Sequence, residues 1–393
     1  MKFCIVLKNK LINQLLLYIS YLIFGVLNLI KFISGYQFSV VTPFRIGHLA
    51  GEIDQFLREQ RLNNKNHKRI IVTGKACNSI LVKILSRHVK IKQSPFMFRL
   101  LSYMKRRFPQ QTVILPLGMT LNEFSLYKKV NSLVNLLESE IEFGFQLIKK
   151  KYNIKKNDWW VCFHSRDNKY FEKNIKNDLR HHDYRNCEIK NMLLAMDHIT
   201  KLGGYAIRYG AIAEEPLKTK NKKIIDYTFN GRTEFLDIFL MAKSRFFVGN
   251  TSGTTHLAKL FSVPYIMTNL VPFFPMPEQT KSIFLLKKMI DYNNKVMTYK
   301  DCYNLGMFEK EKGTKFSLVK GYQDLKITPL ENSKEEILGA TKDMLYLLEN
   351  KKKSLKTIAK HNQIRDQFYS TYREYKLAGQ LSPAFIKINQ RLF

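Results

Sequence analysis

The feature of this chain that most constrains its fold is the repeated order of strand, loop and helix. Residues 69–73 (RIIVT) are expected to form a strand, Gly74 to lie in the loop after it, and residues 78–87 to form a helix. The same order precedes them, with a β-type run at residues 38–41 and a helix near residues 49–59. Strands and helices that alternate in this way are typical of a parallel α/β sheet.

A second α/β set is expected after a helix at residues 133–151 and a polar junction at residues 153–158. Its strands are short, apolar and separated by helices, which is the pattern of a doubly wound sheet. The predicted strands are residues 159–164, 205–209, 223–227, 245–249 and 263–268, and the predicted helices are residues 188–202, residues 233–242 and a helix that Ser252 opens.

The charge of the chain points to an acidic partner. Its 393 residues include 65 Lys and Arg against 32 Asp and Glu, a net charge of +33. A nucleotide diphosphate, an anionic membrane or nucleic acid would each match this excess. Coding bias is the alternative, but it explains many lysines better than so few acids. Because the chain has no nucleic-acid-binding motif and no interleaved aromatic and basic residues, we expect no nucleic acid among its partners.

An apolar segment near the start of the chain predicts a membrane contact. Residues 11–33 are mostly apolar, with Asn13, Gln14, Asn28 and Lys31 as interruptions. The length is borderline for a bilayer span, and no A-x-A-like cleavage site follows. A single span, an interfacial helix and a buried helix all remain open. We expect attachment to the cytoplasmic face of the bacterial inner membrane, because an anionic leaflet there attracts a basic chain.

A phosphate site is expected where the strand at residues 245–249 gives way to a helix. The sequence GNTSGTTHLAKLF (residues 249–261) places small residues and hydroxyls at a helix N-terminus. Free backbone N–H groups and the helix dipole both favour an anion there, and small residues let the backbone approach it. The alternative is an ordinary N-cap. The candidate phosphate-binding residues of this segment are Asn250, Thr251, Ser252, Gly253 and Thr254.

The sequence HSRD (residues 164–167) follows another apolar strand, at the edge of the sheet where open α/β folds bind ligands. Arg166 can bind a diphosphate with two nitrogens and stabilise its charge as it leaves. His164 and Asp167 would then contact the base or ribose or move a proton. The alternative is a strand-end ion pair between Arg166 and Asp167.

Two further motifs are candidates for an active-site role. The sequence DLRHHDYRN (residues 178–186) has His and Asp at a spacing that fits no standard zinc site. We therefore expect it to form an active-site loop that becomes ordered over the bound ligand. The chain contains no D-x-D pair, which favours a mechanism without metal or cofactor. Near the N-terminus, Arg45, Gly47 and His48 follow the first strand and could face a cleft, although a structural His is an equal alternative.

These segments together resemble a family of bacterial glycosyltransferases. The likeness covers roughly residues 36–275. It rests on elements in a fixed order: RIGHL (45–49), FHSRD (163–167), HDYRN (182–186), a strand that ends in I-R-x-G (204–210), IDY (225–227), DIFL (237–240), FFVGNTSG (246–253) and a V-P strand (263–264). A weaker likeness connects His164 and Arg166 to the His-x-Arg motif of GT-B fucosyltransferases, which use GDP-fucose.

The resemblance implies a GT-B-like enzyme with two Rossmann-like α/β domains that face each other across a cleft. It implies that Arg166 holds the donor diphosphate, that His164 and Asp237 approach the base or ribose, and that GDP is the nucleotide. Asp167 and His48 are candidates for the general base, and Tyr184, Arg185 and Arg208 are further cleft candidates.

The expected reaction transfers a hexose or deoxyhexose to a glycan or lipid-linked acceptor in surface polysaccharide or lipopolysaccharide synthesis. The expected segments are an apolar one (1–35), an acceptor domain (36–155), a donor domain (156–350) and a basic helical tail (351–393). A basic protein without catalytic activity, which binds an anionic membrane or nucleic acid, is the alternative.

Overall fold

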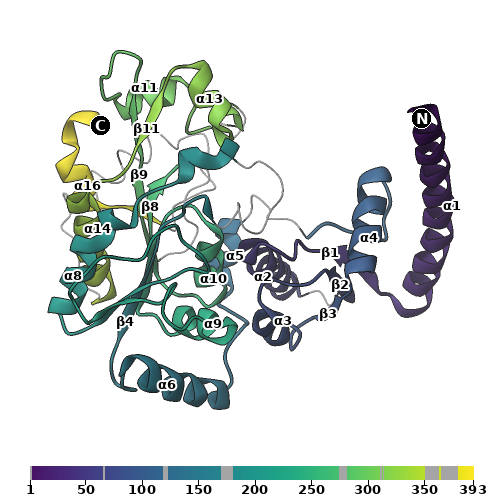
Figure 1. Ribbon diagram of the computed structural model, residues 1–393, viewed down its shortest axis with the longest axis horizontal. Coiled ribbons are helices and arrows are strands. Elements are labelled where there is room, and N and C mark those ends of the chain that lie inside the picture. The colour runs from purple at the N-terminus through teal and green to yellow at the C-terminus, as the bar shows by residue number, and fades with distance from the viewer. Residues whose placement is uncertain are drawn as a thin grey trace. The chain divides into compact units, whose positions relative to one another are not determined.

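The computed structural model describes residues 2–64, 67–117, 123–169, 180–273, 281–309, 314–349 and 379–393, together with Lys312 and Gln363. The chain divides into two compact units, unit 1 (Met1–Met119) and unit 2 (Thr120–Phe393) (Figure 1). Each unit contains a parallel sheet, which confirms the α/β class and the two Rossmann-like units expected from the sequence. The cleft between them stays a prediction.

Unit 1 is a three-stranded parallel sheet with helices around it (Figure 1). Its strands are β1 (Gln37–Val40), β2 (Arg69–Thr73) and β3 (Lys90–Gln93), in the order β1-β2-β3. Its helices are α1 (Lys2–Ser34), α2 (Ile46–Leu62), α3 (Ser79–Leu85) and α4 (Pro95–Arg107). Ile114 adds a parallel bridge to Phe38, so the chain after α4 runs extended along β1.

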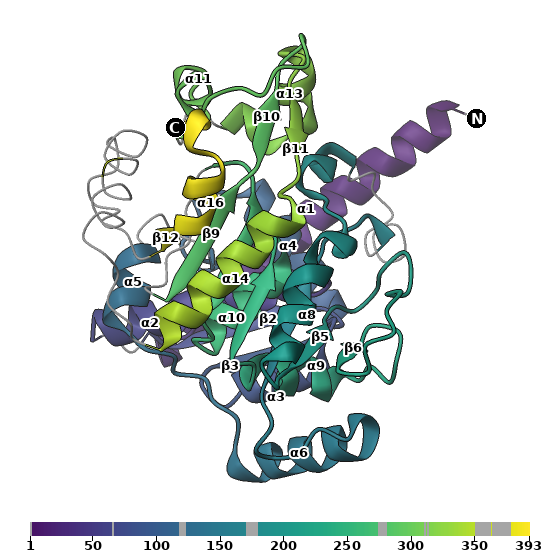
Figure 2. The same ribbon diagram turned by 90° about the vertical axis from the view of Figure 1, so that its left-hand side faces the viewer.

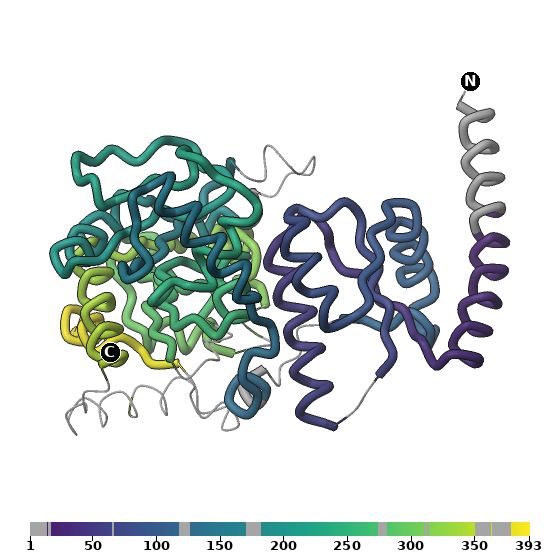
Figure 3. Tube along the Cα trace, turned by 90° about the horizontal axis from the view of Figure 1, so that it is seen from below, coloured from purple at the N-terminus to yellow at the C-terminus, as the bar shows by residue number. Residues whose placement is uncertain are grey.

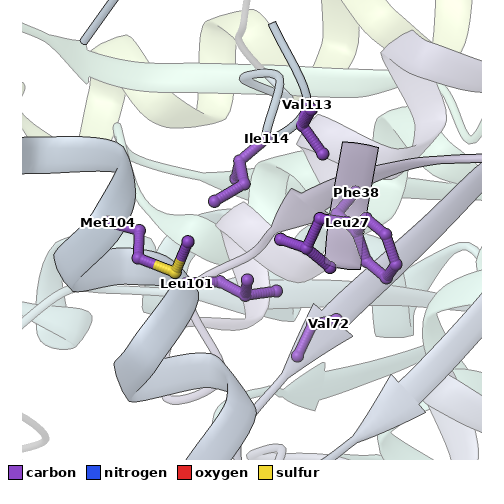
Figure 4. Close-up of a cluster of buried hydrophobic side chains, with 7 residues drawn as sticks. All are labelled: Leu27, Phe38, Val72, Leu101, Met104, Val113 and Ile114. Carbon is purple, nitrogen blue, oxygen red and sulfur yellow. The ribbon is translucent and has the colours of Figure 1, made fainter. Parts of the chain in front are cut away.

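The core of unit 1 includes part of α1. Leu27 is buried in one cluster with residues of β1, β2, α4 and the extended segment (Figure 4). Ile23, Phe24 and Ile30, at helical spacing from Leu27, pack against the same cluster. One face of α1 is therefore part of the fold of unit 1. The cluster consists of Leu27, Phe38, Val72, Leu101, Met104, Val113 and Ile114.

Unit 2 is built on a seven-stranded sheet of order β12-β9-β8-β7-β4-β5-β6, in which every strand pair is parallel. The strands are β4 (Trp160–His164), β5 (Tyr205–Arg208), β6 (Ile224–Asp226), β7 (Phe246–Gly249), β8 (Tyr265–Leu270), β9 (Ser282–Leu286) and β12 (Gln380–Leu381). A separate antiparallel pair is formed by β10 (Lys288–Ile290) and β11 (Thr328–Leu330).

Helices cover both faces of this sheet. α8 (Leu193–Lys201) and α14 (Lys334–Leu348) pack side by side on one face (Figure 2). α9 (Glu234–Ala242) and α10 (Gly253–Leu260) contact each other, and α10 packs on β7 and β8. The other helices among the described residues of unit 2 are α5 (Glu123–Lys129), α6 (Glu138–Tyr152), α11 (Tyr299–Asn304), α13 (Val319–Asp324), α16 (Pro383–Ile388) and the short 3-10 turns η1 (Arg180–Arg185), η2 (Ile189–Met192), η3 (Thr314–Ser317) and η5 (Gln390–Leu392).

The helix expected at residues 133–151 begins later, at Glu138. Before it the chain is held against α10, because the Ser132 hydroxyl donates to the carbonyl of Leu260 at 2.6 Å. The Glu140 carboxylate then accepts the N–H of Leu137 at 2.9 Å and fixes the start of α6. α6 packs on α9, so it belongs to unit 2, whereas the sequence places the domain boundary after it, at 155/156.

The expected basic tail falls partly outside the described residues, which exclude 351–362 and 364–378. Residues 379–393 belong to unit 2. β12 pairs with β9, and Phe385 of α16 is fully buried. The Asp343 carboxylate of α14 accepts the Ser382 hydroxyl at 2.6 Å and the N–H of Ala384 at 3.0 Å. Residues 379–393 are therefore part of the core of unit 2.

Candidate functional site

Two of the candidate segments leave the sheet of unit 2 side by side. The chain proceeds from β4 to β5 and β6, then returns to β7 on the other side of β4. His164 and Gly249, the last residues of β4 and β7, are paired directly. Open α/β sheets bind ligands beyond the carboxyl ends of their strands at such a reversal. Residues 164–167 and 250–254 therefore meet where the fold favours a ligand.

Asn250 fastens three segments at this edge. It is fully buried, its Oδ1 accepts the N–H of Arg166 at 3.1 Å, and its Nδ2 donates to the carbonyl of Arg185 at 2.7 Å. Because both ends of the amide are engaged, Asn250 shapes the loops around the site rather than offering a free side chain.

Arg166 holds the 180–186 segment against the edge of the sheet. Its side chain is buried, and Nη1 donates to the carbonyl of His182 at 3.0 Å and to Oδ1 of Asn186. Burial, followed by the nearby charge of Arg185, lowers the pKa of Arg166 to about 10. The HDYRN motif and the HSRD motif are thus in direct contact at this edge. That the loop covers a donor stays a prediction.

Lys287, at the end of β9, was not singled out from the sequence. Its Nζ donates to the carbonyls of Tyr184 and Asn186, both at 2.9 Å. The side chain is buried, and this burial lowers its pKa. Arg185 donates from Nε to the carbonyl of Thr251 at 3.0 Å. Arg166, Arg185 and Lys287 therefore bring three cations to one segment, which makes the edge attractive to an anion.

The N-terminus of α10 lies at the same edge. Ser252 occupies the N-cap position, but its side chain makes no capping hydrogen bond. Its hydroxyl instead lies 2.8 Å from that of Thr254. Thr251, Ser252 and Gly253 are half-buried. The Ser252 hydroxyl therefore does not cap this helix end. A helix N-terminus favours an anion, so a phosphate at this position stays a prediction.

His164 points its ring toward β5. Its Nδ1 lies 2.8 Å from the carbonyl of Tyr209, which can only accept, so Nδ1 carries the proton and Nε2 has a lone pair. Burial lowers the pKa of His164, which favours this neutral form. Gly210 leaves room for the ring, because a Cβ there would lie 3.2 Å from Nδ1. The glycine of the I-R-x-G motif thus supports the His of the HSRD motif.

Asp167 is half-buried and holds a loop. Its Oδ1 accepts the N–H of Lys169 and its Oδ2 the N–H of Glu214, both at 3.1 Å. These contacts orient the carboxylate at the edge of the sheet.

Asp237 lies inside unit 2, on α9. Its Oδ1 accepts the hydroxyl of Tyr227 at 2.8 Å, and its Oδ2 accepts Nη2 of Arg232 at 2.6 Å. Burial raises the pKa of this carboxyl to about 6, against the opposite effect of Arg232. Both carboxylate oxygens therefore have hydrogen-bond partners within the protein, where the sequence led us to expect a ribose or base.

Arg208 and Tyr184 are also buried in the framework. Arg208 pairs with Asp226 at 3.3 Å, between the ends of β5 and β6. The Tyr184 hydroxyl donates to the carbonyl of Ser317 at 2.8 Å. Both side chains are therefore engaged in contacts within unit 2.

The candidates of unit 1 lie in the first turn of α2. Arg45 is its N-cap residue, Gly47 is buried, and His48 Nδ1 lies 2.6 Å from Oε1 of Glu52. The expectation that they face a cleft stays a prediction.

Among the described residues, no three His, Cys, Asp or Glu side chains are grouped so that they could hold a metal ion. Asp178, of the DLRHHDYRN motif, lies outside the described residues, as does the side chain of His181. Metal independence stays a prediction.

No protein family and no curated protein matches this chain. Among solved structures, the iron-containing heptosyltransferase TibC in complex with ADP-D-β-D-heptose is 13% identical over 60% of this chain and 59% of its own, with a TM-score of 0.34. This chain thus matches less than two thirds of TibC.

A family 9 glycosyl transferase from Veillonella parvula is 14% identical over 70% of this chain and 89% of its own, with a TM-score of 0.40. The E. coli ADP-heptose LPS heptosyltransferase II is 12% identical over 63% and 90%, with a TM-score of 0.39. No site residue is carried over from these structures to this chain.

Proposed function

We propose that this protein is a glycosyltransferase that binds a nucleoside-diphosphate sugar at the edge of unit 2. The observation that carries the proposal is the meeting of Arg166, Arg185 and Lys287 with the N-terminus of α10 at the chain reversal of a parallel sheet. A diphosphate is the common ligand whose charge and size match several cations and a helix N-terminus together.

In this proposal the phosphates lie at Ser252, Gly253 and Thr254, and Arg185 is the cation nearest to them. Arg166 and Lys287 hold the 182–186 segment and contribute their charge. His164, with Nε2 as an acceptor, faces the ribose or base. GDP as the nucleotide and a hexose or deoxyhexose as the sugar rest on the resemblance of the motifs.

The reaction follows from this placement. A hydroxyl of the glycan or lipid-linked acceptor attacks the anomeric carbon, the bond from that carbon to the phosphate oxygen breaks, and the diphosphate leaves with the electron pair. The cations and the helix amides stabilise the charge that grows on the leaving oxygen. Asp167 and His48 are the candidates that take the hydroxyl proton. We place the reaction in the cytoplasm, on the path to a surface polysaccharide or lipopolysaccharide.

The experiment is a panel of GDP, UDP, ADP and CMP and their sugars, with binding followed by calorimetry and transfer by product analysis. Arg185→Gln should weaken diphosphate binding about 10- to 150-fold, the worth of a charged hydrogen bond. Arg245→Gln is the matched control, since this exposed cation stacks on Trp159 at the opposite end of β7. Equal affinities of both variants would remove Arg185 from the proposed site. Binding of no nucleotide at all would leave the alternative of a basic protein without catalytic activity.

Because Arg166, Arg185 and Lys287 would supply the positive charge that a divalent ion supplies in other transferases, transfer should survive EDTA. Loss of activity in EDTA that manganese or magnesium restores would contradict the proposal and direct attention to His182 and Asp183.

A further inference from the structure

The second half of α1 is apolar on two opposite faces. Residues Leu17–Ser34 have a mean hydropathy of 1.7, yet only 11% of them are buried. Leu27 on the inner face is 4% exposed, whereas Leu22 and Phe32 on the outer face are 72% and 89% exposed. We call the outer stripe the α1 outer face; it consists of Tyr18, Leu22, Leu29, Phe32 and Ile33.

No other described segment of unit 1 covers this stripe. Figure 3 shows residues 17–34 along the margin of unit 1, with the body of the unit on one side only. A helix that is apolar all round is normally buried, and a contiguous exposed apolar stripe marks a surface that contacts a partner or a membrane.

The inner face ties α1 to unit 1 and so limits how it can meet a membrane. The Phe108 ring lies 5.4 Å from that of Tyr21 and 5.0 Å from that of Phe24. Lys31 Nζ donates to the carbonyl of Thr112 at 3.3 Å. A helix that crossed a bilayer would have to withdraw Leu27 from its cluster (Figure 4). If α1 meets a membrane, these contacts are kept only when the helix lies along the membrane surface.

Exposed cations of unit 1 lie close to α1. At its C-terminal end, Lys68 Nζ donates to the carbonyl of Ser34 at 3.2 Å, and Lys90 Nζ lies 4.3 Å from the ring centre of Tyr36. Where Phe108 packs on Tyr21 and Phe24, Arg107 lies 5.8 Å from the ring centre of Phe108. An apolar stripe beside exposed Lys and Arg matches the boundary layer of an anionic bilayer. A second copy of this face would instead bring like charges together.

We infer that the α1 outer face inserts into the surface layer of an anionic lipid bilayer, with α1 parallel to the membrane and unit 1 still folded on its inner face. The helix is then a part of the domain that touches lipid, and not a tether that crosses it.

The test is sedimentation of the full-length protein with vesicles of phosphatidylcholine, with and without phosphatidylglycerol. Leu22→Gln combined with Leu29→Gln should lower vesicle binding about 100-fold, since each buried leucine contributes about tenfold or more. Asn28→Gln, an exposed change on the flank of the same helix, is the matched control and should bind as the unchanged protein does. Both variants should unfold at unchanged temperature.

A second pair separates charge from apolar contact. Lys90→Gln combined with Arg107→Gln should weaken binding to vesicles with phosphatidylglycerol about 25-fold, at about fivefold per cation, and leave binding to pure phosphatidylcholine unchanged. The orientation of α1 can be measured with the tryptophan introduced by Tyr18→Trp. Lipids brominated close to their headgroups should quench its fluorescence more than lipids brominated at the ends of their acyl chains.

Several results would overturn the inference. One is a dimer that the paired leucine changes convert to a monomer while vesicle binding is unaffected, which would assign the face to a second copy. Another is quenching that is strongest at the bilayer centre, which would mean a spanning helix. A third is an intact mass from cells that lacks residues 1–34, which would mean a removed signal segment.

Discussion

Replacing Arg166 by Met separates its effect on stability from its effect on anion binding. The change removes two charge-assisted hydrogen bonds, to the His182 carbonyl and to Asn186, at about 1.5–3 kcal/mol each. It also removes a buried charge. The pKa of Arg166 is lowered to about 10 from 12.5, which corresponds to about 3 kcal/mol of unfavourable charge burial. The two effects nearly offset each other, so we expect a net loss of about 0–3 kcal/mol.

The assay is urea unfolding combined with titration of the nucleotide that binds the unchanged protein. We expect Arg166→Met to fold and to bind the diphosphate at least tenfold more weakly, because one of three cations and the order of the 182–186 segment are lost. Arg245→Met serves as the control and should change neither quantity. If Arg166→Met fails to fold, the lost hydrogen bonds outweigh the relief of charge burial and the expected balance is wrong. If it binds the nucleotide normally, the proposed role of Arg166 is wrong.

Four further substitutions test the packing and hydrogen bonds described above, through their effect on stability. Asp237 has a folded-state pKa of about 6 because of burial, so the native state holds this proton more tightly than the unfolded chain does. Stability should therefore fall by about 2 kcal/mol as the pH rises from 4 to 6, and urea unfolding of Asp237→Asn should lack that slope. Gly210→Ala should displace the His164 ring and cost about 1–3 kcal/mol in the same assay. Leu27→Ala should cost about 2–5 kcal/mol, whereas Leu22→Ala should stay within about 0.5 kcal/mol; equal effects would contradict the buried inner face of α1.

The sheet of unit 2 could be predicted because its signals are local. Each strand is a short apolar run that ends at a polar or glycine-containing loop, so β4 and β7 were expected within a residue of their ends. The start of α6 was wrong, because apolar periodicity continues upstream of Glu138. The chain upstream is held instead by the bond from Ser132 to the carbonyl of Leu260, a contact that no local pattern contains. The Glu140 carboxylate then accepts the N–H of Leu137 where α6 begins.

The residues of the candidate site likewise include some that the sequence indicates and some that it does not. The sequence places Arg166 and Asn250 at one edge because parallel strands end together. It does not reveal Lys287, whose partners lie about a hundred residues earlier, at Tyr184 and Asn186. Asp237 shows the opposite difficulty. A carboxylate bound to Tyr227 within the fold has the same sequence appearance as one that awaits a ribose.

The position of β12 has a consequence for the order of folding. β12 is paired with β9, which lies almost a hundred residues earlier, and Leu381 and Phe385 complete the core around it. Unit 1 closes with Ile114 against β1, so it can fold while the rest of the chain is still being synthesised. Unit 2 cannot bury the outer side of β9 until residues 380–385 have been made. During translation, unit 1 can therefore be folded while unit 2 is still incomplete. The edge of β9 is then exposed and can pair with the wrong strand.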